Sequence, residues 1–230
     1  MSETVEIALT IIAQTAVSVG AGGSSGTLAD KSIVRDGWKR PIIPGSQVKG
    51  KARHAAEALV KSLEFAHVQQ DFDDDESEQN VIRTIFGSPR CRSPLQFADL
   101  VGVVGEVERL DALKDQAEQH QSQIRPSVAI NRRRGVADDA RLLFQETTVD
   151  GIRFYAARAI TGHLPSVGHA ALLWAALRLL PRWGGASSRG MGWADVAITV
   201  SYAGAELSEE QLQHALRELE TRKGEPDTHE

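Results

Sequence analysis

Residues 43–53, with the sequence IPGSQVKGKAR, impose a tight turn that leads directly into a helix. Pro44 ends the preceding segment, because its ring fixes φ and disfavours helical geometry in the residue before it. Ser46 is a favourable N-cap, whose hydroxyl can accept a hydrogen bond from an amide of the first turn. Apolar residues then recur at helical spacing, which predicts a helix that packs on a sheet and ends near Phe65.

The start of this helix is a predicted anion site. Free N–H groups and the helix dipole favour negative charge at a helix N-terminus. Lys49 and Arg53 share a helix face with Ser46, so two cations lie below the turn. Gly45, which has no side chain, would let a ligand approach the backbone closely.

Two other interpretations of this stretch stay open. One is a capped surface helix with solvated lysines. The other is a nucleotide-binding P-loop, because residues 45–51 match the pattern G-x-x-x-x-G-K. Ala52 stands where a P-loop has the Ser or Thr that binds magnesium, and residues 39–44 contain two prolines and two charges, which suits a buried strand poorly.

The charge of the chain is unevenly distributed. The formal net charge is −5, yet residues 30–61 carry eight Lys or Arg against three acidic residues. Residues 124–141 carry five against two, and residues 178–190 carry three with no acidic residue. Such segregation can direct a polyanion to one surface of an acidic protein.

Hydrophobic periodicity predicts an α+β fold. A glycine-rich loop at residues 20–30 and an Asp150-Gly151 turn, a hairpin signal, interrupt the pattern. The element order predicts a modified ferredoxin-like or RNA-recognition-motif plan with an antiparallel sheet, long loops and a projecting insertion. The predicted strands are 4–18, 95–104, 142–148, 152–160 and 194–202, and the predicted helices are 46–65, 106–123, 166–180 and 208–222, the last capped by Ser208.

Four separated motifs resemble those of the RAMP superfamily of CRISPR-associated proteins. Residues 43–53 resemble its IPGSSLKGxxR motif, and residues 184–192 (GGASSRGMG) resemble its C-terminal glycine-rich loop. Residues 85–99 are similar to its LFG…L.F.D signature, and residues 130–146 to its IDRxTGxA…LFxxE signature. The resemblance spans residues 30–192 and is greatest to the repeated backbone subunit of type III CRISPR effector complexes.

The resemblance implies a single RAMP domain over residues 1–206, with a thumb insertion at approximately 101–140, and a C-terminal helix and tail over 207–230. It implies an antiviral-defence subunit that binds guide RNA along a filament and cleaves complementary target RNA at regular intervals. Asp30 matches the catalytic aspartate, which precedes the IPGS motif in this family, and Asp36 is a rival carboxylate. Without the resemblance, Asp30 would be interpreted as an ordinary turn aspartate.

The chemistry is plausible from the residues alone. RNA supplies its 2′-hydroxyl as nucleophile, so the protein must align the flanking nucleotide and place a base or a metal ligand nearby. The RNA-binding contacts implied by the resemblance or by charge are sequence-independent. These predicted RNA-binding residues are Lys31, Arg35, Gly45, Ser46, Lys49, Arg53, Arg125, Arg132, Arg133, Ser187, Ser188 and Arg189, with solvated surface arginines as the alternative for the three between 125 and 133.

The expected cofactor is a divalent metal, Mg²⁺, for cleavage. The single cysteine, Cys91, gives no support for a structural zinc. The expected partners are guide RNA, target RNA, further copies of the chain and other subunits of a type III complex, in a cytoplasmic setting without a signal peptide or membrane span. The alternative function is a catalytically inactive structural RAMP subunit.

Overall fold

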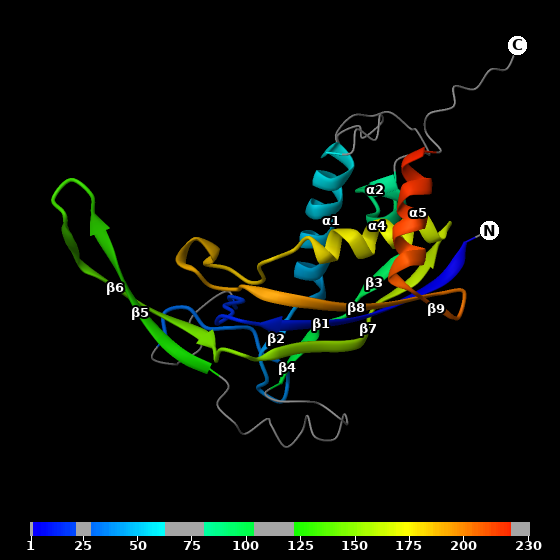
Figure 1. Cartoon of the computed structure of the whole chain (residues 1–230). Coiled ribbons are helices and arrows are strands. Elements are labelled where there is room, and N and C mark those ends of the chain that lie inside the picture. The colour runs from blue at the N-terminus through cyan, green and yellow to red at the C-terminus, as the bar shows by residue number, and fades with distance from the viewer. Residues whose placement is uncertain (1, 22–28, 63–80, 104–121, 222–230) are drawn as a thin grey trace, which may run out of the picture.

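The computed structural model describes residues 2–21, 29–62, 81–103 and 122–221. Its elements follow the chain from an N-terminal strand to a C-terminal helix (Figure 1). They are β1 (Glu3–Ala13), β2 (Ile42–Ile43), α1 (Gly45–Ser62), α2 (Val81–Phe86), β3 (Leu95–Phe97), β4 (Leu100–Val103), β5 (Ser122–Asn131), β6 (Val136–Thr148), β7 (Arg153–Leu164), α4 (Val167–Arg178), the 3₁₀ turn η1 (Ser187–Arg189), β8 (Ala194–Tyr202), β9 (Ala205–Leu207) and α5 (Glu209–Thr221).

The main sheet is antiparallel and has the strand order β2-β4-β7-β1-β8-β9, with β3 also paired to β7. The central pair is β7 and β1, which align Leu164 with Glu3 at one end and Arg153 with Ile12 at the other. Strand β2 and helices α1 and α2 lie between β1 and β3 in the chain, and α4 connects β7 to β8. The predicted α+β class with an antiparallel sheet is confirmed, and the ferredoxin-like description remains a prediction.

Helices cover one face of this sheet (Figure 1). Along β1, Val5, Ile7, Leu9 and Ile11 are fully buried, whereas the residues between them are partly exposed. This alternation follows from the two-residue period of a strand, which directs every second side chain to the helix-covered face. α4 is apolar on nearly all sides and belongs to the same core as β1, α1 and α5.

A separate hairpin, β5–β6, projects from one end of the main sheet (Figure 1). Its register runs from Ser122↔Thr148 to Asn131↔Val136. The predicted thumb at 101–140 therefore contains β5 and its turn, but the second strand continues to Thr148; residues 104–121 lie outside the described part of the chain.

The predicted hairpin around Asp150-Gly151 is wrong. Gly151 does adopt a left-handed turn conformation at φ 78°. However, β6 pairs with β5 and β7 pairs with β1, β3 and β4, so the turn marks the exit from the projecting hairpin into the main sheet.

Other element boundaries also differ from the predictions: β1 ends at Ala13 rather than at residue 18, β6 begins at Val136 rather than at residue 142, and β7 ends at Leu164 rather than at residue 160. The expected strand 95–104 is divided into β3 and β4, and Asp99 in the break accepts the N–H of Gly45 at 2.8 Å. Helix α1 ends in the described residues at Ser62, and the predicted end near Phe65 lies outside them. The predicted helix 106–123 ends in residues of strand β5, and its part before Ser122 is not described.

The cap of the C-terminal helix is as predicted. The N–H of Gln211 donates to Ser208 Oγ at 3.3 Å, and the N–H of Ser208 donates to Gln211 Oε1 at 2.8 Å. This reciprocal pair is a capping box, which satisfies two N–H groups at the start of α5.

Candidate functional site

Asp30 lies against strand β6 at the base of the projecting hairpin. Its backbone N–H donates to the carbonyl of Phe144 at 2.9 Å, and the N–H of Phe144 donates to Asp30 Oδ2 at 2.8 Å. Lys31 continues this pairing as a parallel bridge to Gln145, and its carbonyl accepts the N–H of Glu146 at 2.8 Å. Asp30 is exposed, so its carboxylate is held in place by one oxygen and still reaches solvent.

Glu146 anchors the segment that follows Asp30. It accepts the N–H of Ile33 at 3.0 Å and a guanidinium N–H of Arg35 at 2.7 Å. Burial alone raises the pKa of Glu146, but the hydrogen bonds from Arg35, Ile33 and Ser122 and the charge of Arg35 outweigh it and hold the pKa below its usual range. The carboxylate therefore stays charged and fixes the loop to β6.

This arrangement changes the interpretation of Arg35. Its guanidinium contacts Glu146 and donates to the carbonyl of Lys39 at 2.6 Å. The predicted RNA-binding residue thus positions the protein's own loop. Sequence reasoning singled out the LFxxE motif that contains Glu146 but gave Glu146 no role, because its partners lie more than a hundred residues away.

Asp36, the rival carboxylate, is occupied within its own turn. One oxygen accepts the N–H groups of Trp38 at 3.0 Å and Arg40 at 2.9 Å. The other forms an ion pair with the guanidinium of Arg40 at 2.6 Å. Asp36 therefore organises a turn, whereas the exposed Asp30 lies where a ligand can reach it.

Helix α1 begins one residue earlier than predicted. The carbonyl of Pro44 accepts the N–H groups of Gln47 at 2.9 Å and Val48 at 3.1 Å, so Ser46 is inside the first turn and is not the N-cap. A Cβ atom on Gly45 would lie 2.1 Å from the carbonyl oxygen of Phe97. A glycine is therefore required at position 45 because the helix start packs closely against the chain's own backbone at Phe97, and not because a ligand approaches it.

The P-loop interpretation is wrong. Residues 45–51 are helical, whereas a P-loop wraps its N–H groups around a phosphate in an open loop. The first N–H group of this helix already donates to Asp99. Any anion at this helix start shares the site with a protein carboxylate and relies on the flanking cations.

Lys49 and Arg53 share a face of α1, as their spacing predicts. Lys49 Nζ lies 5.9 Å from the ring centre of Phe97, and partial burial, followed by the charge of Arg53, lowers the pKa of Lys49 from its usual range. Arg53 pairs with Glu57 at 2.8 Å and reaches the carbonyl of Gly87 at 3.4 Å. Lys49 thus borders strand β3, and Arg53 borders the residue that follows α2.

The glycine-rich loop folds back on the residues after β1. Gly185 donates to the carbonyl of Ser18 at 2.6 Å, and Gly192 donates to that of Ala16 at 2.9 Å. Between these anchors, residues Ser187–Arg189 form the exposed turn η1. The loop therefore presents two hydroxyls and one cation to solvent from a fixed base.

The segment that anchors the glycine-rich loop also contacts strand β6, to which Asp30 is hydrogen-bonded. Gln145 donates to Ser18 Oγ at 2.8 Å, and Ser18 Oγ donates to the carbonyl of Glu146 at 3.3 Å. The segment after β1 thus joins the glycine-rich loop to β6 and, through β6, to Asp30. The start of α1 lies elsewhere, at the junction of β3 and β4, and strand β7 separates β4 from β1.

The hairpin carries the remaining predicted cations. Arg125 on β5 forms an ion pair with Asp150 at 3.5 Å. Arg132 and Arg133 are exposed in the hairpin turn, where Asn131 Oδ1 accepts the N–H of Arg133 at 3.1 Å. The hairpin also exposes large apolar side chains, namely Ile124, Val128, Ile130, Val136, Leu142 and Phe144.

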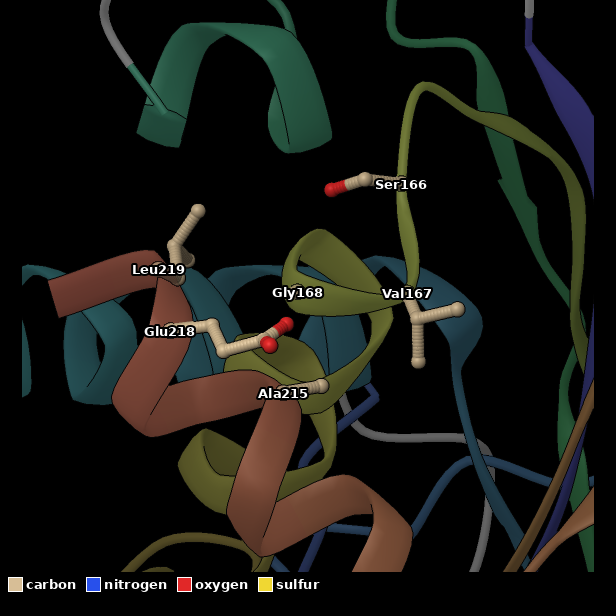
Figure 2. Close-up of a pocket in the computed structure, with 6 residues that line it drawn as sticks. All are labelled: Ser166, Val167, Gly168, Ala215, Glu218 and Leu219. Carbon is tan, nitrogen blue, oxygen red and sulfur yellow. The ribbon is translucent and has the colours of Figure 1, made fainter. Parts of the chain in front are cut away.

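A pocket of about 220 Å³ lies between the start of α4 and α5 (Figure 2). The carboxylate of Glu218 points toward Gly168 at the N-terminus of α4, where the helix dipole favours negative charge. Helices α4 and α5, which form this pocket, lie at the opposite end of the molecule from the tip of the projecting hairpin (Figure 1). Its lining residues are Ser166, Val167, Gly168, Ala215, Glu218 and Leu219.

Within the described ranges, no group of three or more His, Cys, Asp or Glu side chains lies close enough together to hold a metal ion. Asp30 offers one carboxylate, and Mg²⁺ commonly binds through one or two carboxylates together with substrate phosphates and water. Of the described residues, Asp30 could contribute one carboxylate to an ion that also binds RNA phosphates. No described helix is long and apolar enough to cross a membrane.

Comparison with known proteins identifies the family of this chain. A family model of the RAMP superfamily matches residues 10–195. The chain belongs to the RAMP superfamily. The RAMP resemblance of the four motifs is thereby confirmed, and a search of curated proteins found no significant match.

Solved structures share the fold of this RAMP protein. A chain of a cryo-EM structure of the type III-B Cmr-beta bound to cognate target RNA has a TM-score of 0.58 and 14% identity over 87% of the RAMP protein. The RAMP protein spans 62% of that chain's length. A chain of the apo-state type III-B Cmr-beta structure has a TM-score of 0.58 and 13% identity, with coverage of 84% of the RAMP protein and 96% of the other chain.

Proposed function

We propose that this RAMP protein is a guide-binding backbone subunit of a type III CRISPR effector complex and that it cleaves complementary target RNA at Asp30. Family membership over residues 10–195 supports the first part, together with the fold shared with type III-B Cmr-beta chains. The observation that carries the second part is the attachment of Asp30 to β6 through Phe144. It holds an exposed carboxylate beside the β5–β6 hairpin, and we infer that this hairpin acts as the thumb that displaces one base of the guide–target duplex.

In the proposed reaction, the 2′-hydroxyl of the nucleotide before the cut attacks the adjacent phosphorus. Asp30 accepts the hydroxyl proton, the bond from phosphorus to the 5′-oxygen breaks, and that oxygen takes a proton from water. The products are a 2′,3′-cyclic phosphate and a 5′-hydroxyl. Most of the rate comes from holding the three reacting atoms in line, which the protein achieves by displacing a base.

Mg²⁺ is part of the proposal as an ion carried by RNA. When bound, it would neutralise charge on the scissile phosphate. Exposed cations would hold the RNA backbone without reading its sequence. Lys31 lies beside Asp30, whereas Arg132 and Arg133 present their charge from the distant hairpin turn and Arg189 from η1. The complex would act in the cytoplasm with guide RNA, further copies of the chain and other subunits.

The test uses the reconstituted complex with a matched target RNA. Asp30→Asn keeps an oxygen for the N–H of Phe144 and removes only the charge. We expect Asp30→Asn to abolish cleavage with unchanged target affinity. The matched control is Asp150→Asn, an exposed carboxylate at the hairpin base, which should leave cleavage and affinity intact. Cleavage at every site by Asp30→Asn with normal binding would show that Asp30 is not the catalytic residue. Normal target binding by the wild-type complex without any cleavage would instead favour the alternative, a structural RAMP subunit whose Asp30 is a turn residue.

A further inference from the structure

The turn between Arg35 and Pro41 presents an exposed indole on a rigid support. Arg35 and Pro41 form an isolated antiparallel bridge, and the N–H of Asp36 donates to the carbonyl of Arg40 at 2.9 Å. Inside the turn, Asp36 accepts the N–H of Trp38 at 3.0 Å. The Trp38 side chain is nevertheless 54% exposed, although its backbone is fixed.

A buried cation supports this indole. Arg40 is only 4% exposed, and its guanidinium pairs with Asp36 at 2.6 Å. Its central carbon lies 4.6 Å from the ring centre of Trp38. The ion pair therefore holds the indole in one orientation through a cation–π contact and leaves much of the ring surface available.

The turn is fixed to the same strand as Asp30. The carbonyl of Lys39 accepts a hydrogen bond from Arg35 at 2.6 Å, and Arg35 pairs with Glu146. Asp30 is fixed to Phe144, two residues before Glu146 on β6. Since a strand advances about 3.3 Å per residue, the two anchors are roughly 7 Å apart along β6. Lys39 has a φ of 61°, a conformation uncommon for a residue with a side chain.

We propose that Trp38 is a stacking platform for an unpaired base of the RNA that passes Asp30. This inference rests on the proposed function, because it assumes that RNA occupies this surface. Every nucleobase has a flat face, so the Trp38 indole, held by its cation–π contact with Arg40, can stack on any base without sequence preference. Lys39, next to Trp38, and Lys31, next to Asp30, are exposed cations that suit RNA phosphates better than an apolar protein partner.

The test measures affinity of the full chain for a single-stranded oligoadenylate, with an oligomer of equal length whose ribose units carry no bases as reference. Trp38→Ala and Trp38→Leu should weaken oligoadenylate binding by about five- to a hundredfold, the usual range for base–aromatic stacking. Trp38→Phe should retain most of the affinity. All three should bind the base-free oligomer like wild type and should keep the salt dependence of wild type, because no phosphate contact is lost.

Two controls make the result specific. Leu179→Ala removes another large exposed apolar side chain, at the end of α4, and should have no effect on RNA binding. The thermal midpoint of the Trp38 variants should stay near that of wild type, since the indole is largely exposed.

The outcomes separate this inference from the proposed function. Equal oligoadenylate affinity of wild type and Trp38→Ala would overturn the platform while RNA binding by the chain stands. Absence of RNA binding by wild type would overturn both. Loss of co-assembly with other subunits in Trp38→Ala, with normal RNA affinity, would assign the indole to a protein interface and also overturn the platform.

Discussion

Glu146 accepts a hydrogen bond from Arg35 at 2.7 Å, and this ion pair joins the segment after Asp30 to the base of the projecting hairpin. The side chains are 11% and 25% exposed, so the pair is screened less than a surface ion pair. Loss of one partner would leave the other charged and largely buried, which is a costly arrangement.

Glu146→Gln should lower the free energy of unfolding by about 1–3 kcal/mol at pH 7, the usual cost of leaving a buried partner without its bond. The folded-state pKa of Glu146 is lowered. Its contribution is therefore fully present above the unfolded pKa of about 4.3 and is lost as pH falls through the folded value. Urea unfolding at pH 7 and below pH 4 should show the difference between wild type and variant shrinking with acid.

The control for this prediction is Glu6→Gln. Glu6 pairs with Arg158 at 2.6 Å, but the side chains are 42% and 67% exposed, so its removal should change stability little. A difference between wild type and Glu146→Gln that is independent of pH would show that the charge of Glu146 contributes nothing.

Gly45→Ala should destabilise the protein severely. The new methyl group would lie 2.1 Å from the carbonyl oxygen of Phe97, where only backbone movement can relieve the clash. Gly50→Ala is the matched control in the same helix, because a Cβ there meets nothing within 4 Å. That variant should gain up to about 1 kcal/mol from helix propensity. Thermal unfolding compares the two, and equal stabilities would contradict the close packing of α1 on β3.

Lys49→Ala should weaken RNA binding equally for all sequences and reduce the slope of log affinity against log salt by about 1. Arg53→Ala should change the slope less, because Arg53 already pairs with Glu57. Affinities at several salt concentrations, for two guide RNAs of different sequence, test this. Base-specific loss in Lys49→Ala would contradict a contact to phosphate.

The sequence predicted those helices and strands whose conformation depends mainly on residues close together in the chain. The alternation of Val5, Ile7 and Leu9 with polar or small residues gave β1, although the strand ends at Ala13 rather than residue 18. The Ser208 cap and the apolar run of α4 were predicted for the same reason: helix ends and buried helices are encoded within a few residues.

The features that could not be predicted depend on strand pairing and contacts between residues far apart in the sequence. Asp150-Gly151 looks like a hairpin turn, but Phe154 aligns with Ile11 of β1 and Thr148 aligns with Ser122 of β5. The same limit applied to the site. The motifs pointed to Asp30, but nothing local indicates that Arg35 turns toward Glu146 instead of solvent.

The parallel bridge between Lys31 and Gln145 has a mechanical consequence. Asp30 is connected to the arm formed by β5 and β6, and the turn of that arm, at Arg134, lies roughly 30 Å away along the strand. A tilt of the arm therefore carries Asp30 with it. Under the proposed function, the end of the arm and the Asp30 carboxylate at its base would move together as one rigid unit, with a separation set by the strand rather than by the flexibility of a loop.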